Sequence, residues 1–297
     1  MKKVIITGAG GFVGSELTRK MIAHGISVVA ISQFFGEAFP QSPLITKIEA
    51  EISDSESLLN IIPVDKYDAF YHFAWVGVNG EKKADPGVQL DNIKMAVCCA
   101  AVAKSLECGK FLCSGTVAER AVESLSHLER TSGGMTYGIA KHCAHLMLET
   151  YCKNIGQPFV WMQFSNIYGP QNKTGNIVSY TLGEILQGRE ADFGPALQPY
   201  DFIYVDDLVE AVYRLGIYDT SKNYYFIGSG KPRILKDYLT EIGDLCGQPE
   251  LIKIGTRADD GVIYSMDMFD NRDLVNDIGE YVSKDFGECI KYTIEHC

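Results

Sequence analysis

The feature that most constrains this chain is a glycine-rich turn directly after its first apolar run. Val4-Ile5-Ile6 is a short β-branched run, glycines follow at positions 8, 11 and 14, and a helix-like pattern covers residues 15–24. Strand, glycine turn and helix in this order open a dinucleotide-binding βαβ unit. The first glycine permits a sharp turn, the second lets backbone N–H groups approach a pyrophosphate, and the third lets helix and strand pack closely.

The composition of the chain limits the kinds of molecule that it can bind. The chain has 297 residues with 46% hydrophobic and 22% charged, which is typical of a soluble enzyme with one large domain or two closely joined ones. The formal net charge of −11 argues against a nucleic-acid polymer or an anionic membrane, because both are bound by basic surfaces. No apolar run approaches the roughly 20 residues of a membrane span. The apolar run after Met1-Lys2-Lys3 is too short for a signal peptide and is broken by glycine.

The cysteines and histidines predict no metal centre. Nine cysteines occur without any C-x-x-C pair, a pattern of reduced thiols in a cytoplasmic protein. His142 and His145 are expected on one helix face. No third ligand lies near them in the sequence, so we expect packing or surface roles for both.

The apolar pattern along the chain predicts an α/β fold. Strands are expected at 27–31, 44–48, 69–73, 110–113 and 159–164, and helices at 55–62, 88–106 and 136–155. Four of these strands are almost entirely apolar, as expected for strands buried on both faces. We therefore predict a Rossmann-type doubly wound parallel sheet with a smaller C-terminal substrate lobe.

The regular alternation of predicted strands and helices ends after residue 165. A helix is expected at 176–187, a strand at 201–205 and a helix at 206–215, with shorter pieces from 224 onward. The predicted organisation is a dinucleotide-binding domain at 1–165, to which 201–222 returns. Residues 166–200 and 223–297 are expected to form a substrate-binding lobe.

A second group of residues indicates redox chemistry on a hydroxyl or carbonyl. Tyr137 and Lys141 are four residues apart, so they share one face of the helix expected at 136–155. An ammonium beside a phenol favours the phenolate, so we expect a lowered pKa and an acid–base role for Tyr137. Ser114 follows a buried strand, at the sheet edge where substrates bind in open α/β folds.

Together these motifs resemble the extended short-chain dehydrogenase/reductase family of nucleotide-sugar epimerases, dehydratases and reductases. The motifs are Thr7-Gly8-x-x-Gly11-x-x-Gly14, Ser114-x-Thr116, Tyr137-x-x-x-Lys141, Asn166-Ile167-Tyr168-Gly169-Pro170 and Asp201-Phe202-Ile203-Tyr204-Val205-Asp206-Asp207, in that order. The resemblance implies a nicotinamide dinucleotide cofactor, a nucleotide-sugar substrate and the catalytic residues Ser114, Tyr137 and Lys141. We also expect a homodimer.

The resemblance assigns the binding residues as well. Asn92 matches an asparagine in the helix beside the active site, and Glu51-Ile52 resembles the segment that contacts the adenine amino group. The expected cofactor contacts are Gly8, Gly11, Phe12, Val13, Gly14, Ser32, Glu51, Ile52, Phe73, Ala74, Asn92, Tyr137 and Lys141. The expected substrate contacts are Thr116, Asn166, Asn176, Tyr200, Lys231, Arg233 and Arg257.

Departures from the family pattern narrow the reaction. Gly115 and Thr116 stand where 4,6-dehydratases carry an Asp-Glu pair, which argues against dehydration. Ser32 stands where NAD-binding members usually carry an acid, so nothing repels a 2′-phosphate and we favour NADP(H) over NAD(H). The nearest following cation is Lys47.

Two other positions lack the family's usual arginine. They hold Tyr200 and Gln163, so a substrate diphosphate needs other cations, for which Lys231, Arg233 and Arg257 are candidates.

The preferred reaction is NADPH-dependent reduction at C4 of a nucleotide-linked 4-ketosugar, whose hexose we expect to be deoxygenated. The alternatives are a redox-neutral NAD-dependent 4-epimerase and, from another class, a non-enzymatic NADP-sensing regulator on the same fold. Such regulators tend to lose the tyrosine and lysine, which this chain keeps.

Overall fold

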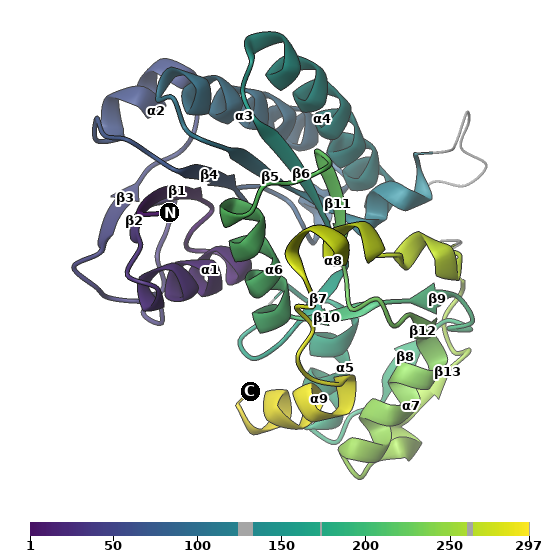
Figure 1. Cartoon of the computed structure of the whole chain (residues 1–297). Coiled ribbons are helices and arrows are strands. Elements are labelled where there is room, and N and C mark those ends of the chain that lie inside the picture. Colours follow the sequence, from purple (N-terminus) through teal and green to yellow (C-terminus); the bar gives the residue numbers. More distant parts are fainter. Residues whose placement is uncertain (124–132, 173, 260–263, 297) are drawn as a thin grey trace.

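The computed structural model describes residues 1–123, 133–172, 174–259 and 264–296. Its centre is a seven-stranded parallel sheet with the strand order β11-β6-β5-β4-β1-β2-β3 (Figure 1). The strands are β1 (Lys3–Thr7), β2 (Ser27–Ser32), β3 (Ile45–Glu49), β4 (Ala69–His72), β5 (Phe111–Thr116), β6 (Phe159–Phe164) and β11 (Tyr224–Ile227). The predicted Rossmann-type parallel sheet is therefore confirmed.

Helices cover both faces of this sheet. They are α1 (Phe12–Ala23) and α6 (Val205–Ile217) on one face, and α2 (Ser55–Ile61), α3 (Pro86–Ser105) and α4 (Gly133–Ile155) on the other (Figure 1). Successive strand residues point to opposite faces. Val4 and Ile6 of β1 accordingly pack in one apolar core with Leu17, whereas Ile5 packs with Phe70 in the other. This two-sided burial explains the continuous apolar runs in the strands.

The remaining elements form a lobe at the carboxyl end of the sheet (Figure 1). Three small sheets join β7 (Asn166–Tyr168) to β10 (Phe202–Tyr204), β9 (Pro199–Tyr200) to β12 (Arg233–Ile234), and β8 (Ala191–Phe193) to β13 (Ile252–Ile254). The lobe helices are α5 (Ile177–Ile185), α7 (Leu235–Leu245), α8 (Arg272–Ile278) and α9 (Phe286–Glu295). Short 3-10 turns are η1 (Glu81–Lys83), η2 (Val117–Ala121), η3 (Pro249–Leu251) and η4 (Met266–Phe269).

The structure corrects the predicted division of the chain at two points. Residues 224–227, expected in the lobe, form β11 and pair with β6 at the edge of the main sheet. The strand expected at 201–205 is shorter, and it pairs with β7 outside the main sheet. Sequence alone identifies apolar strands but not their neighbours, because pairing is decided by tertiary packing.

Within the described part of the chain, no helix combines the length and the apolar character that crossing a membrane requires.

Candidate active site

The glycine turn between β1 and α1 is packed too closely to accept side chains at Gly8, Gly10 and Gly14. A Cβ on Gly10 would lie 2.1 Å from the carbonyl oxygen of Phe34. Gly8 has φ +70°, and a Cβ there would lie 2.6 Å from the backbone nitrogen of Ala74. A Cβ on Gly14 would lie 2.2 Å from the carbonyl oxygen of Gly8. Gly11 instead has one close neighbour, at 3.2 Å, and it N-caps α1 without any side-chain hydrogen bond. The helix N-terminus therefore leaves N–H groups for an anion, as a dinucleotide pyrophosphate requires.

A cavity of about 210 Å³ opens beside this turn, and its walls match the predicted cofactor site in part. Its lining residues are Gly8, Gly11, Ile31, Ser32, Gln33, Ala50, Ile52, Phe73, Ala74, Trp75, Val76 and Met95. None of these lining residues carries a charge. Glu51, expected to contact adenine, is exposed and does not line the cavity, because its neighbour Ile52 points inward instead.

Other expected cofactor residues do not line the cavity but pack behind its walls. Phe12 and Val13 are partly buried against the core under α1. Asn92 accepts a 2.8 Å hydrogen bond from the backbone N–H of Val76 and donates a 2.8 Å bond to the carbonyl of the same residue. The asparagine therefore fixes the loop after β4, which forms one wall of the cavity.

The three expected catalytic residues come from β5 and α4. The Lys141 ammonium donates a 2.7 Å hydrogen bond to the carbonyl oxygen of Ser114 and lies 3.5 Å from its hydroxyl. A side-chain hydrogen bond joins Thr116 to Tyr137. Ser114, Thr116, Tyr137 and Lys141 therefore form one constellation at the carboxyl end of the sheet.

The electrostatics of this constellation differ from the expectation. Burial raises the pKa of Tyr137 above its ordinary value, and the bond with Thr116 offsets only part of that rise. The predicted lowering of the Tyr137 pKa by Lys141 is wrong for this structure, because the ammonium is directed at Ser114. Burial also lowers the pKa of Lys141 to about 8, against the opposing influence of Cys113 and Glu119.

Sequence reasoning missed Trp75, which contacts two of the expected catalytic residues. The Lys141 ammonium lies 3.7 Å from the centroid of the Trp75 ring. The ring also meets Tyr137 edge-on, with centroids 6.3 Å apart. The signal available in the sequence was its place just beyond the predicted strand at 69–73, where binding residues gather.

Glu119 was missed too, although Thr116-Val-Ala-Glu119 has the spacing of a capping box. Its buried carboxylate accepts a 2.6 Å hydrogen bond from the N–H of Thr116 and a 3.1 Å bond from the indole N–H of Trp161. Burial raises the pKa of Glu119 to about 7.

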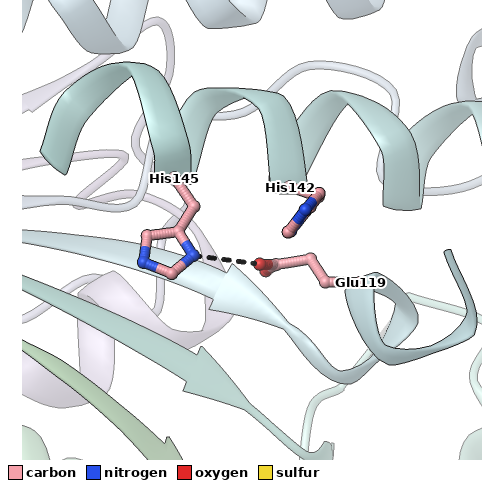
Figure 2. Close-up of side chains that lie close together, drawn as sticks. All are labelled: Glu119, His142 and His145. Atoms are coloured by element: carbon pink, nitrogen blue, oxygen red, sulfur yellow. Dashed lines mark ion pairs between the residues drawn. The ribbon is translucent and has the colours of Figure 1, made fainter. Parts of the chain in front are cut away.

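Figure 2 shows Glu119 facing His142 and His145, with His145 Nδ1 4.0 Å from a carboxylate oxygen. The expectation that no third ligand lies near these histidines is therefore wrong: η2 brings the carboxylate to within 4.8 Å of both rings. Zinc needs donors about 2.0–2.2 Å from the ion. The carboxylate already accepts two hydrogen bonds, and His145 stacks on Trp161 with a centroid separation of 5.0 Å. These contacts support the packing role that we predict for the histidine.

The expected substrate residues are less closely gathered. Asn166 donates to the carbonyl of Asp201 at 3.1 Å, and Asn176 caps α5 by accepting from Ser179 at 2.9 Å. Tyr200 packs against Phe202, with centroids 5.2 Å apart. These contacts fix the junction between the sheet and the lobe.

The three candidate cations lie in different surroundings. Arg233 pairs with Glu241 at 2.6 Å, and it lines a cavity of about 150 Å³ together with Lys231, apart from the cofactor cavity. Arg257 donates a 2.8 Å hydrogen bond to the Tyr180 hydroxyl. The structure therefore brings Lys231 and Arg233 to one cavity, which Arg257 does not line.

Gln163, at a position where the family often has arginine, cannot contact a ligand because it is fully buried. Its carbonyl oxygen accepts 2.6 Å hydrogen bonds from Arg120 and Tyr224. The guanidinium near this position belongs to Arg120, which is hydrogen-bonded to Gln163 within the protein.

A glycine turn at a helix N-terminus, on a parallel sheet with Ser114, Tyr137 and Lys141 gathered near its carboxyl edge, is typical of a Rossmann-type dinucleotide-binding fold. A sequence model of the NAD dependent epimerase/dehydratase family matches residues 4–228. The chain belongs to this family, whose members are enzymes of the extended short-chain dehydrogenase/reductase type.

Known relatives are distant in sequence but close in fold. The CDP-abequose synthase of Salmonella muenchen is 23% identical over 247 residues, which cover 80% of this chain and 78% of that protein. The UDP-glucose 4-epimerase of Thermotoga maritima, solved with UDP-glucose, has a TM-score of 0.85 at 20% identity and covers 99% of this chain and 98% of its own. The dTDP-glucose 4,6-dehydratase of Bacillus anthracis, solved with NAD, has a TM-score of 0.83 at 17% identity, with coverage of 99% and 96%.

Proposed function

We propose that this protein is an oxidoreductase acting at C4 of a nucleotide-linked hexose, and that its net reaction is NADPH-dependent reduction of a 4-ketosugar. Support comes from the constellation of Ser114, Tyr137 and Lys141 beside the charge-free cavity. The nicotinamide supplies hydride to the sugar carbon when it is bound. Tyr137 donates the proton that the new hydroxyl needs, Ser114 holds the reacting oxygen, and Lys141 binds the nicotinamide ribose.

Burial raises the pKa of Tyr137, so the phenol is protonated and available as a proton donor. A phenol that keeps its proton is an acid, and reduction of a carbonyl needs an acid at the developing alkoxide. Removing a hydroxyl proton, the first step of an oxidation, would instead need the phenolate.

The close packing around Gly115 argues against a 4,6-dehydratase activity. A Cβ on Gly115 would lie 2.3 Å from the indole nitrogen of Trp161 and 2.6 Å from a Glu119 oxygen. The catalytic acid that dehydratases carry after the hydroxyl residue therefore has no room here. Glu119, the acid that this Cβ would meet, is buried and accepts hydrogen bonds from Thr116 and Trp161.

The choice of cofactor rests on the residues at the end of β2. Ser32 and Gln33 line the cavity there, and no carboxylate among the lining residues opposes a 2′-phosphate. Lys47, on the neighbouring β3, lies over the rings of Phe35 and Phe39 in the loop that follows Ser32. Lys47 is therefore close to this loop, and we propose that it contributes to NADP(H) preference.

A redox-neutral 4-epimerase is the second candidate, and the likeness to the UDP-glucose 4-epimerase of Thermotoga maritima favours it. An epimerase retains its cofactor through each turnover, whereas a reductase must exchange it.

We assign the substrate contacts to Thr116, Asn166, Asn176 and Tyr200, with Lys231, Arg233 and Arg257 as the cations for a diphosphate. The homodimer remains a prediction.

The test is to purify the protein without added cofactor and identify any bound dinucleotide by mass spectrometry. Turnover is then measured with a nucleotide-4-keto-6-deoxyhexose and either NADPH or NADH. We expect little bound cofactor and stoichiometric oxidation of NADPH. Tightly bound NAD together with interconversion of two sugar epimers would reject the reductase and leave the epimerase.

A further inference from the structure

We propose that Trp75 is a positioning residue, whose indole face holds the Lys141 ammonium in place for binding the nicotinamide ribose. The inference rests on the proposed function, because it acts through the role given there to Lys141. Trp75 lines the cofactor cavity and also contacts Lys141 and Tyr137, so one side chain joins that cavity to the catalytic constellation.

The first argument is the environment of the ammonium. Lys141 is 2% exposed, so its charge has lost nearly all contact with water. Its shortest hydrogen bond goes to the carbonyl oxygen of Ser114, at 2.7 Å. The negative face of the Trp75 ring, 3.7 Å from the ammonium, supplies a second stabilising contact. Without it the buried charge would rest on the Ser114 carbonyl, on the Ser114 hydroxyl at 3.5 Å, and on the electrostatic influence of Cys113 and Glu119.

The second argument is that the indole is itself held in position. Its N–H donates a 2.8 Å hydrogen bond to Gln89, which is 1% exposed. The Gln89 amide donates in turn to the carbonyls of Gly77 and Lys82, at 3.1 and 3.2 Å. A buried glutamine whose amide is fully occupied defines the orientation of the ring, so the contact with Lys141 is built into the structure.

The third argument is that the same ring contacts Tyr137. The edge-on arrangement, with an interplanar angle of 85°, is a preferred geometry for aromatic pairs. One side chain therefore touches both the residue that donates the proton and the residue that binds the ribose. A substitution that keeps an aromatic ring should preserve both contacts, whereas an aliphatic one of similar bulk should preserve neither.

The experiment compares Trp75→Phe with Trp75→Leu, and combines Trp75→Leu with Lys141→Met in a double-mutant cycle. Dissociation constants for NADPH are measured by calorimetry on proteins with matching circular dichroism spectra. We expect Trp75→Leu to weaken binding about 3- to 30-fold, the range of a buried cation–π contact, and Trp75→Phe about twofold or less. In the Lys141→Met background, Trp75→Leu should have no further effect.

Two results overturn the inference alone: equal losses for Phe and Leu, or a Leu effect that persists undiminished in the Lys141→Met background. Both would mean that Trp75 acts by packing, independently of the ammonium. A wild-type protein that binds neither NADPH nor NADH would overturn the proposed function, and this inference with it.

Discussion

The Lys141 ammonium donates its 2.7 Å hydrogen bond to the backbone carbonyl of Ser114, while the Tyr137 hydroxyl is joined to Thr116. The lysine and the tyrosine therefore contact different residues of β5. The tyrosine keeps its proton because burial raises its pKa, and the lysine keeps its charge next to a carbonyl and an aromatic face. This division suits a reduction, in which the phenol is an acid and the ammonium binds.

Replacing Tyr137 by Phe should lower turnover by about 10²- to 10⁴-fold, because acid–base steps contribute that much. Binding of NADPH should change little, since Ser114 and Lys141 remain. Steady-state kinetics and a cofactor titration measure the two effects. Tyr151→Phe, on the same helix α4, is the matched control and should keep full activity. Near-normal turnover of the Tyr137 variant would remove this residue from the mechanism.

Cofactor affinity should depend on pH through Lys141, whose pKa burial lowers to about 8. The ammonium exists below this pKa and is lost as the pH rises through it, so the affinity for NADPH should fall above about pH 8. Between this pKa and the ordinary value of 10.5 the folded state binds fewer protons than the unfolded chain. The contribution of Lys141 to the free energy of unfolding should therefore rise with pH across that window.

The measurement is a series of cofactor titrations from neutral to alkaline pH, with Lys141→Met as the reference. The variant should bind more weakly and show no decrease near pH 8. Glu119 also titrates close to this range, so Glu119→Gln serves as a second reference and should retain the alkaline decrease. A decrease that persists in Lys141→Met would assign it to another group.

Two glycines of the same turn should respond differently to valine. Gly11→Val should abolish dinucleotide binding while the protein remains folded, because its nearest neighbour is 3.2 Å from the added Cβ and the position faces the cavity. Gly14→Val should prevent folding, since its Cβ would lie 2.2 Å from a carbonyl oxygen. Circular dichroism and a cofactor titration separate the two outcomes. Micromolar affinity in folded Gly11→Val would mean that the phosphates bind elsewhere.

Ser32→Asp should shift cofactor preference toward NADH. An aspartate at the end of β2 accepts hydrogen bonds from the ribose hydroxyls and repels a 2′-phosphate. We expect the ratio of NADPH to NADH affinity to fall by at least tenfold, or about 1.4 kcal/mol. Ser27→Asp, at the opposite end of the same strand, is the control that keeps the ratio. An unchanged ratio in Ser32→Asp would contradict a ribose site at Ser32.

What the sequence predicts well here is determined locally. Gly8 must tolerate a positive φ and Gly14 must permit a close approach, so their spacing identifies the turn without knowledge of the rest of the chain. The contact between Glu119 and His145 joins residues 26 positions apart through a turn and a helix, so no local pattern predicts it. The contact between the Lys141 ammonium and Trp75 was missed for a similar reason, because it joins two segments of the chain that are far apart in sequence.

Transfer of a labelled hydride tests the central claim most directly. NADPH deuterated at the reactive position of the nicotinamide is incubated with the protein and a nucleotide-4-keto-6-deoxyhexose, and the product is examined by NMR and mass spectrometry. We predict one deuterium at C4 of the sugar, a single C4 configuration, and one NADPH consumed for each product molecule. Interconversion of two C4 epimers with no consumption of NADPH and no deuterium in the sugar would contradict the account.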